Sequence, residues 1–126
     1  MTRLFLTYAA LCVVLTVPAA TASDRPLKGP EIAALIKGNT VTGKTGKGGW
    51  KQFFAANGET SYSSRGETPS YGSWEVRGDK FCSQWPPEEH WSCYTVTGDL
   101  NAAPKTITWI SGGGKTFPGE VQDGKM

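Results

Sequence analysis

The sequence predicts a mainly β fold: a single short N-terminal helix packed on an antiparallel meander of seven or eight strands, curled into a barrel or half-barrel and held by one disulfide. Sixteen glycines and eight prolines in 126 residues favour short strands joined by many turns over a helical bundle. The pairs Asn57-Gly58, Gly78-Asp79 and Gly98-Asp99 are typical of tight turns. Successive strands without helices between them pair with their chain neighbours, which makes the sheet antiparallel.

Residues 1–22 have the pattern of a cleaved secretory signal peptide. A basic residue precedes an apolar run over residues 4–17, and Ala20 and Ala22 are the small residues expected before a cleavage site. The run is shorter than the roughly 20 residues that a membrane-spanning helix needs. We therefore expect cleavage after Ala22, a single small β domain at residues 23–126 with no membrane span, and a periplasmic or secreted location.

A helix is predicted over residues 30–38, which begin with proline and end with glycine. Ile32, Leu35 and Ile36 stand at i, i+3 and i+4 and so form one apolar stripe. Because so short a helix is marginal by itself, we expect the stripe to dock on the sheet and close one end of it.

Beyond residue 38 the pattern is one of short strands bounded by turn residues. The predicted strands are residues 40–42, 50–56, 59–63, 71–77, 80–85, 90–97 and 106–111, with a last one at 115–117 or 120–122. Inward side chains of a small barrel either fill its interior or line a cavity. We expect a filled interior, with a ligand cavity as the alternative. The candidate ligand-lining aromatic residues are Trp50, Trp74 and Trp109.

Cys82 and Cys93 are predicted to form a structural disulfide across a hairpin. With these two opposite each other, Phe81 faces Tyr94 and residues 86–89 become the connecting loop. The alternatives, a redox pair or metal ligands, lack the C-x-x-C spacing and the partner histidines. The core face of this hairpin is then Phe81, Trp85, Tyr94 and Val96, and the other face is Lys80, Cys82, Gln84, Cys93 and Thr95.

No catalytic, metal-binding or cofactor-binding site is predicted. His90 is the only histidine, and it lies beside Glu88 and Glu89 in a predicted turn, which gives too few ligands for zinc. The remaining carboxylates have no spacing that singles out a catalytic pair. The candidates for such a pair are Glu59, Glu67, Glu75 and Asp79.

Residues 38–45 match the pattern G-x-x-x-x-G-K-[ST] of phosphate-binding loops. Such a loop needs a strand before it and a helix after it, whereas here a predicted helix comes first and strands follow. We therefore reject nucleotide hydrolysis. Lys44, Lys47 and Lys51 are interpreted as part of a solvated loop, because a formal net charge of +2 does not give the wide basic footprint of a nucleic-acid binder.

The order of the segments 35–40, 72–76, 81–85 and 93–94 resembles small exported bacterial proteins of unknown function. In those proteins a short helix ending in a G-N-T turn leads into a G-x-W strand and a C-x-x-W…C hairpin. The resemblance covers most of residues 31–111 and implies a compact periplasmic β domain without assigned catalytic residues. The layout is more distantly similar to small secreted barrels that inhibit proteases or lysozymes.

We therefore expect a non-enzymatic, monomeric binding module that is periplasmic or secreted. Its partner would be a protein, an envelope polymer or a small apolar ligand, and an inhibitor is one form of such a module; no nucleic acid and no cofactor are expected. The alternatives are a small cell-envelope enzyme that uses carboxylates or His90, and a structural or stress-related envelope protein.

Overall fold

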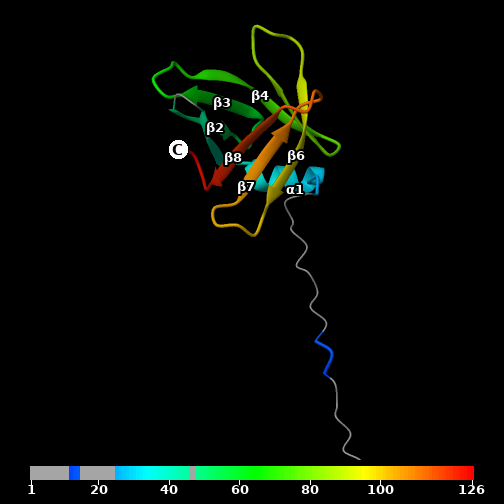
Figure 1. The fold of residues 1–126 in the computed structure, drawn as a ribbon. Coiled ribbons are helices and arrows are strands. Elements are labelled where there is room, and N and C mark those ends of the chain that lie inside the picture. The colour runs from blue at the N-terminus through cyan, green and yellow to red at the C-terminus, as the bar shows by residue number, and fades with distance from the viewer. Residues whose placement is uncertain (1–11, 15–24, 46–47) are drawn as a thin grey trace, which may run out of the picture.

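The computed structural model describes residues 12–14, 25–45 and 48–126. Within them the chain forms one helix, α1 (Gly29–Ile36), followed by eight strands that close into an antiparallel barrel (Figure 1). The strands are β1 (Thr40–Thr45), β2 (Gly48–Phe54), β3 (Glu59–Ser64), β4 (Ser70–Arg77), β5 (Lys80–Gln84), β6 (Ser92–Asp99), β7 (Thr106–Ile110) and β8 (Thr116–Gln122). Each strand pairs with the next along the chain, and β8 returns to pair with β1. The predicted fold class is confirmed, with a closed barrel rather than a half-barrel.

The predicted signal segment, residues 1–22, lies outside the described residues except for 12–14. Cleavage after Ala22 therefore stays a prediction. Cys12 falls within this segment and is exposed. No helix in the described ranges is long and apolar enough to cross a bilayer.

Helix α1 closes one end of the barrel, as its apolar stripe predicts (Figure 1). The buried stripe consists of Ile32, Leu35 and Ile36, which are 0 to 5% exposed. Two hydrogen bonds donated by backbone N–H groups tie the helix region to the sheet: Gly29 donates to the side-chain Oδ1 of Asp79 (2.8 Å), and Gly38, just beyond the helix, donates to the backbone carbonyl of Phe54 (2.7 Å). Burial of the stripe against the strands supplies the stability that eight helical residues lack by themselves.

An ion pair holds the first turn of α1 in place. Arg25 donates two hydrogen bonds to the carboxylate of Glu31, at 2.8 and 2.9 Å, and the backbone N–H of Lys28 donates a third at 3.0 Å. These contacts lower the pKa of Glu31 to about 2, and the hydrogen bonds from Arg25 make the largest contribution. A carboxylate at this position also suits the positive end of the helix dipole.

The core occupies the half of the barrel next to α1. Side chains alternate inward and outward along every strand. Apart from Thr60, which is opposite Phe54, the inward ones at this end are apolar. They are Val41, Phe54, Trp74, Val76, Phe81, Val96, Ile107, Trp109 and Val121, together with Leu27 and the helix stripe. Phe54 lies at the centre, with its ring edge-on to Trp74 (5.8 Å) and to Phe81 (5.6 Å). The expectation of a filled interior therefore fits this half of the barrel.

The predicted disulfide joins β5 to β6. Cys82 and Cys93 are directly opposite each other, with their Cα atoms 4.1 Å apart, and Phe81 faces Tyr94 in the same register. On the face assigned to the core, Phe81 and Val96 are buried, whereas Tyr94 and Trp85 are only half-buried. The ladder ends at Ser83 opposite Ser92, so the connection between the two strands is longer than the loop predicted at residues 86–89. The chain turns earlier, with Glu88 N–H donating to the Trp85 carbonyl at 3.0 Å.

The barrel closes along a short seam between β1 and β8. Only three residue pairs form there, from Thr40 opposite Gln122 to Thr42 opposite Glu120, after which the two strands separate. β8 is one continuous strand, where two shorter alternatives were expected. Pro118 is compatible with the strand because β1 no longer pairs with β8 at this point, so the missing N–H faces an edge.

Candidate functional site

The half of the barrel away from α1 is hollow. An open cavity of about 620 Å³ lies there, which we call the aromatic cup. Its lining residues are Trp50, Gln52, Tyr62, Ser70, Tyr71, Phe81, Ser83, Trp85, Pro86, Tyr94, Trp109 and Phe117. They come from the ends of β2 to β8 that lie opposite the helix, and from the start of the β5–β6 loop. The interior is thus filled at one end and open at the other.

The wall of the cup is a ring of contacting aromatic side chains. Trp50 stacks on Tyr62, with centroids 5.9 Å apart and 28° between the planes, and Tyr62 meets Trp85 edge-on at 6.4 Å. On the opposite side Tyr94 meets Phe117 edge-on at 6.2 Å. Stacked and edge-on rings around an open cavity suit a flat apolar guest.

Glycines on neighbouring strands make room for two of these rings. A Cβ at Gly43 would lie 2.3 Å from the indole ring of Trp50, and one at Gly72 would lie 2.9 Å from the ring of Trp85. Both glycines occupy inward positions: Gly43 is directly opposite Trp50 in the β1–β2 pairing, and Gly72 on β4 lies next to the ring of Trp85, which follows the end of β5. A Cβ at either position is attached to the strand backbone, which cannot easily move away. The ring would therefore have to move instead, into the cavity.

Trp109 forms the floor of the cup. Its ring contacts Phe81 at 5.6 Å, Phe54 at 5.9 Å and Trp50 at 6.3 Å, and it is 5% exposed. The indole Nε1 of Trp109 is buried and has no hydrogen-bond partner among the described residues. The floor therefore combines apolar rings with one unused donor.

The polar groups of the cup are uncharged. Ser83 Oγ accepts a hydrogen bond from Trp85 Nε1 at 3.2 Å, and Tyr62 Oη accepts one from Ser64 at 3.3 Å. Gln52 Nε2 donates to Thr60 Oγ1 at 3.1 Å. No Asp, Glu, Lys, Arg or His belongs to the described residues that line the cup, so a charged group held deep inside would have no partner of opposite sign.

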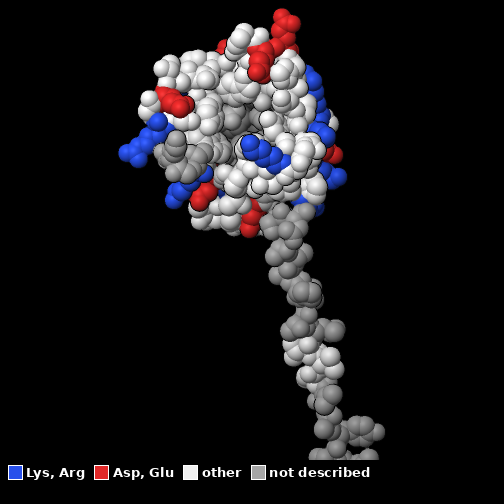
Figure 2. Space-filling model, turned by 45° about the horizontal axis from the view of Figure 1, so that its top comes forward, with Lys and Arg blue, Asp and Glu red and all other residues white. Residues whose placement is uncertain are grey.

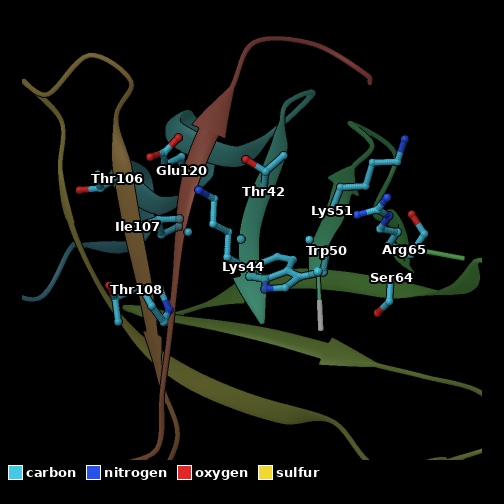
Figure 3. Close-up of a pocket in the computed structure, with 16 residues that line it drawn as sticks. Thr42, Lys44, Trp50, Lys51, Ser64, Arg65, Thr106, Ile107, Thr108 and Glu120 are labelled. Atoms are coloured by element: carbon cyan, nitrogen blue, oxygen red, sulfur yellow. The ribbon is translucent and has the colours of Figure 1, made fainter. Parts of the chain in front are cut away.

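A second hollow, of about 950 Å³, lies where β1 and β8 separate, and we call it the seam hollow. Figure 3 shows Ile107 and Glu120 on one side of the view, Ser64 and Arg65 on the other, and Lys44 beside Trp50 between them. Its lining includes the cations Lys44, Lys51 and Arg65 and the anion Glu120. Trp50 contributes to both hollows and is the partition between them.

The candidate tryptophans occupy two different environments. Trp50 and Trp109 line the cup, whereas Trp74 lies deeper and does not. Trp74 is 7% exposed, and its Nε1 donates to the carbonyl of Ala55 at 2.9 Å. Trp74 therefore belongs to the filled half of the barrel.

The acidic residues and His90 are not assembled into a site. His90 and Glu88 are exposed in the β5–β6 loop, with 3.4 Å between Nε2 and Oε2. Glu75 pairs with Arg77 on the outer face of β4, and Asp79 accepts the hydrogen bond from α1. The described residues contain no group of three or more His, Cys, Asp or Glu side chains placed to hold a metal ion.

The charges do not form one basic face. Figure 2 shows Lys and Arg interspersed with Asp and Glu over the visible surface, which also has a hollow bordered mainly by uncharged residues. Of the three lysines near Trp50, Lys44 and Lys51 line the seam hollow, while Lys47 lies outside the described residues.

Sequence reasoning did not single out several residues of the cup. Tyr62 and Phe117 lie on inward positions of their strands, and strand alternation extended into the polar stretches was the signal that could have found them. Tyr94 is predicted on the core face of the cysteine hairpin, and it lies in the wall of the cup. Ser83 was hidden between a cysteine and a glutamine in the same hairpin. No sequence pattern indicated that the aromatic rings of the cup leave an open space between them.

The fold and the site together define a small antiparallel barrel with one end closed by a helix and the other open as a neutral aromatic cup. No protein-family model, curated protein or solved structure matches the chain.

Proposed function

We propose that this chain is a non-enzymatic binding module that takes a small, flat, largely apolar ligand into the aromatic cup. The observation that carries the proposal is the ring of aromatic side chains around an open cavity of about 620 Å³. A cavity of this size falls in the range of small-molecule sites, and barrel mouths are frequent places for them. Among the partners expected from the sequence, a small apolar ligand fits a concave, ring-lined cup better than a protein surface or a polymer does.

The proposal of a binding role rather than catalysis rests on where the acid–base groups lie. Catalysis needs such groups within hydrogen-bond reach of a bound substrate. His90 and Glu88 are solvent-exposed in a loop, and Glu75 forms an ion pair with Arg77 outside the barrel. None of these four residues lines the cup.

We further propose that the protein works in the periplasm or outside the cell. The N-terminal pattern of residues 1–22 supports export, and a disulfide with one fully buried sulfur, that of Cys82, is typical of an oxidising compartment. The intact mass of protein isolated from its host tests this directly. We expect the mass of residues 23–126 less two hydrogens, and a reduced chain with residues 1–22 attached contradicts it.

Binding is tested with N-phenyl-1-naphthylamine, an uncharged aromatic dye that fluoresces when it leaves water. The dye should bind the oxidised protein with a saturable rise in emission, and Tyr62→Ala should weaken binding because it removes a ring from the wall. Trp91→Ala is the matched control: this half-buried ring packs under Arg77 outside the cup. An absence of saturable binding, or equal weakening by both variants, contradicts the proposal.

A further inference from the structure

We propose that the ligand of the aromatic cup carries a carbonyl-type oxygen that accepts a hydrogen bond from Nε1 of Trp109. This inference rests on the proposed function and specifies its ligand class: an uncharged, planar aromatic ketone or quinone. Three observations carry it, namely an unsatisfied donor, the rings that surround it and the neutrality of the cup.

The unsatisfied donor is unusual within this protein. Buried polar groups in folded proteins are nearly always hydrogen-bonded, because leaving one unpaired is unfavourable. Two other indoles follow the rule: Trp74 donates to the Ala55 carbonyl at 2.9 Å and Trp85 donates to Ser83 at 3.2 Å. Among the buried side-chain donors and acceptors of the described residues, Nε1 of Trp109 alone has no partner.

The neighbours of Trp109 explain why the chain does not supply an acceptor. Its ring lies against Phe54, Phe81 and Trp50, and none of these side chains carries an oxygen. Phe54 and Phe81 are buried, whereas Trp50 is half-buried and has open space on its other side, in the seam hollow. Trp50 is therefore the ring that can shift to admit a ligand oxygen, and such side-chain rearrangements are common on binding.

The chemistry of the wall restricts the rest of the ligand. Ser83 is 5% exposed and accepts from Trp85, and its own hydroxyl hydrogen has no acceptor among the described residues. The cup thus offers hydrogen-bond donors and no charge, which favours uncharged oxygen acceptors over carboxylates or ammonium groups. The stacked pair of Trp50 and Tyr62 favours a planar ring system.

The experiment compares 9-fluorenone with fluorene, two planar molecules of nearly equal shape that differ in one carbonyl. Their dissociation constants are measured by calorimetry for the wild-type protein, for Trp109→Phe and for the control Trp74→Phe, whose ring lies outside the cup. We expect the wild type to prefer fluorenone about five-fold, the usual net effect of one hydrogen bond. Trp109→Phe should lose this preference and Trp74→Phe should keep it.

A second readout needs no variant. In the wild-type protein, the indole N–H resonance of Trp109 in a ¹H–¹⁵N spectrum should move downfield with fluorenone and not with fluorene. Equal affinities for the two compounds, an unchanged ratio in Trp109→Phe, or equal shifts of this resonance overturn the inference and leave the proposed function standing. Failure of both compounds to bind overturns the inference together with the proposed function.

Discussion

The indole ring of Trp50 lies directly over the backbone of Gly43, its partner on the neighbouring strand, with only 2.3 Å between the ring atom Cε2 and the place where a Cβ would stand. A glycine inside a strand weakens the strand, since it has no side chain to pack. At this position the absence of a side chain also has a benefit, because it leaves room for the indole ring of Trp50 to lie against the barrel wall. The cup exists because the ring occupies the wall and not the centre.

Substitution of Gly43 by alanine should therefore disturb the cup and the fold together. We expect Gly43→Ala to lower the free energy of unfolding by about 1–3 kcal/mol, the usual range for overpacking, and to weaken dye binding by displacing Trp50. Gly112→Ala is the control, because a Cβ there meets no atom within 4 Å. Denaturant unfolding and dye titration measure both effects, and an unaltered Gly43→Ala protein would show that the ring relocates freely.

Removal of the disulfide should destabilise the barrel without abolishing the cup. We expect the double variant Cys82→Ala, Cys93→Ala to lose about 3 kcal/mol of stability in the chain-entropy description of a short loop. Since Cys82 is fully buried and Cys93 is half-buried, a reductant should reach the bond in the native protein mainly through Cys93 and open it more slowly than in denaturant. Guanidinium unfolding and thiol titration over time test both statements. Rapid reduction under native conditions would argue against them.

The ion pair at the start of α1 should make stability depend on acid. The pKa of Glu31 is lowered from 4.5 to about 2, so the contacts of its carboxylate stabilise the folded state above pH 4.5. This contribution is lost as the pH falls from about 4.5 towards 2, because the carboxylate then becomes protonated. The stability difference between wild type and Glu31→Gln should shrink over that range.

The control for this pH series is Glu67→Gln. Glu67 is exposed in the β3–β4 loop, and its side chain makes no ion pair within the described part of the chain. The difference in stability between wild type and Glu67→Gln should stay constant over the pH range in which the difference between wild type and Glu31→Gln shrinks. If the stability differences of the two variants from wild type vary with pH in the same way, the ion pair is not a source of the acid sensitivity.

Two tryptophan substitutions of the same kind should differ in their effect on folding. Trp74→Phe deletes a hydrogen bond of 2.9 Å and leaves the Ala55 carbonyl without that donor, whereas Trp109→Phe deletes a donor that has no partner. We expect Trp74→Phe to be the more destabilising by about 1–2 kcal/mol. Thermal and denaturant unfolding of the two variants side by side measure this difference, and equal losses would contradict the hydrogen-bond argument.

Much of the fold follows from local patterns in the sequence. The apolar stripe of α1 and the opposition of Cys82 and Cys93 depend only on residue periodicity, and both are confirmed. The sequence predicts the last strand at residues 115–117 or 120–122, whereas β8 is one strand that runs through Pro118, a residue that interrupts the ladder in an ordinary sheet. It stays continuous because β1 has already separated from β8 at that point, a property of barrel closure that lies far away in the sequence.

The cup was harder to predict than the fold. Alternation identifies inward residues, but it does not show whether large rings meet at the centre or lie along the wall. The outcome depends on which residue is opposite each ring: Gly43 beside Trp50 and Gly72 near Trp85 draw the rings outward. Such pairings depend on the register between strands, and the sequence specified that register firmly only at the cysteine hairpin.

The short seam between β1 and β8 affects how long the edge of β1 stays unpaired during folding. Closure brings together segments far apart in the chain, since the hydroxyl of Thr40 bonds the carbonyl of Gly124, 84 positions later. Contacts of such high contact order form late, so β1 keeps an unpaired edge until residues 116–122 have emerged. During that interval the growing sheet is open to pairing with other chains. The final hydrogen bonds therefore set the moment at which a newly made molecule becomes safe from aggregation.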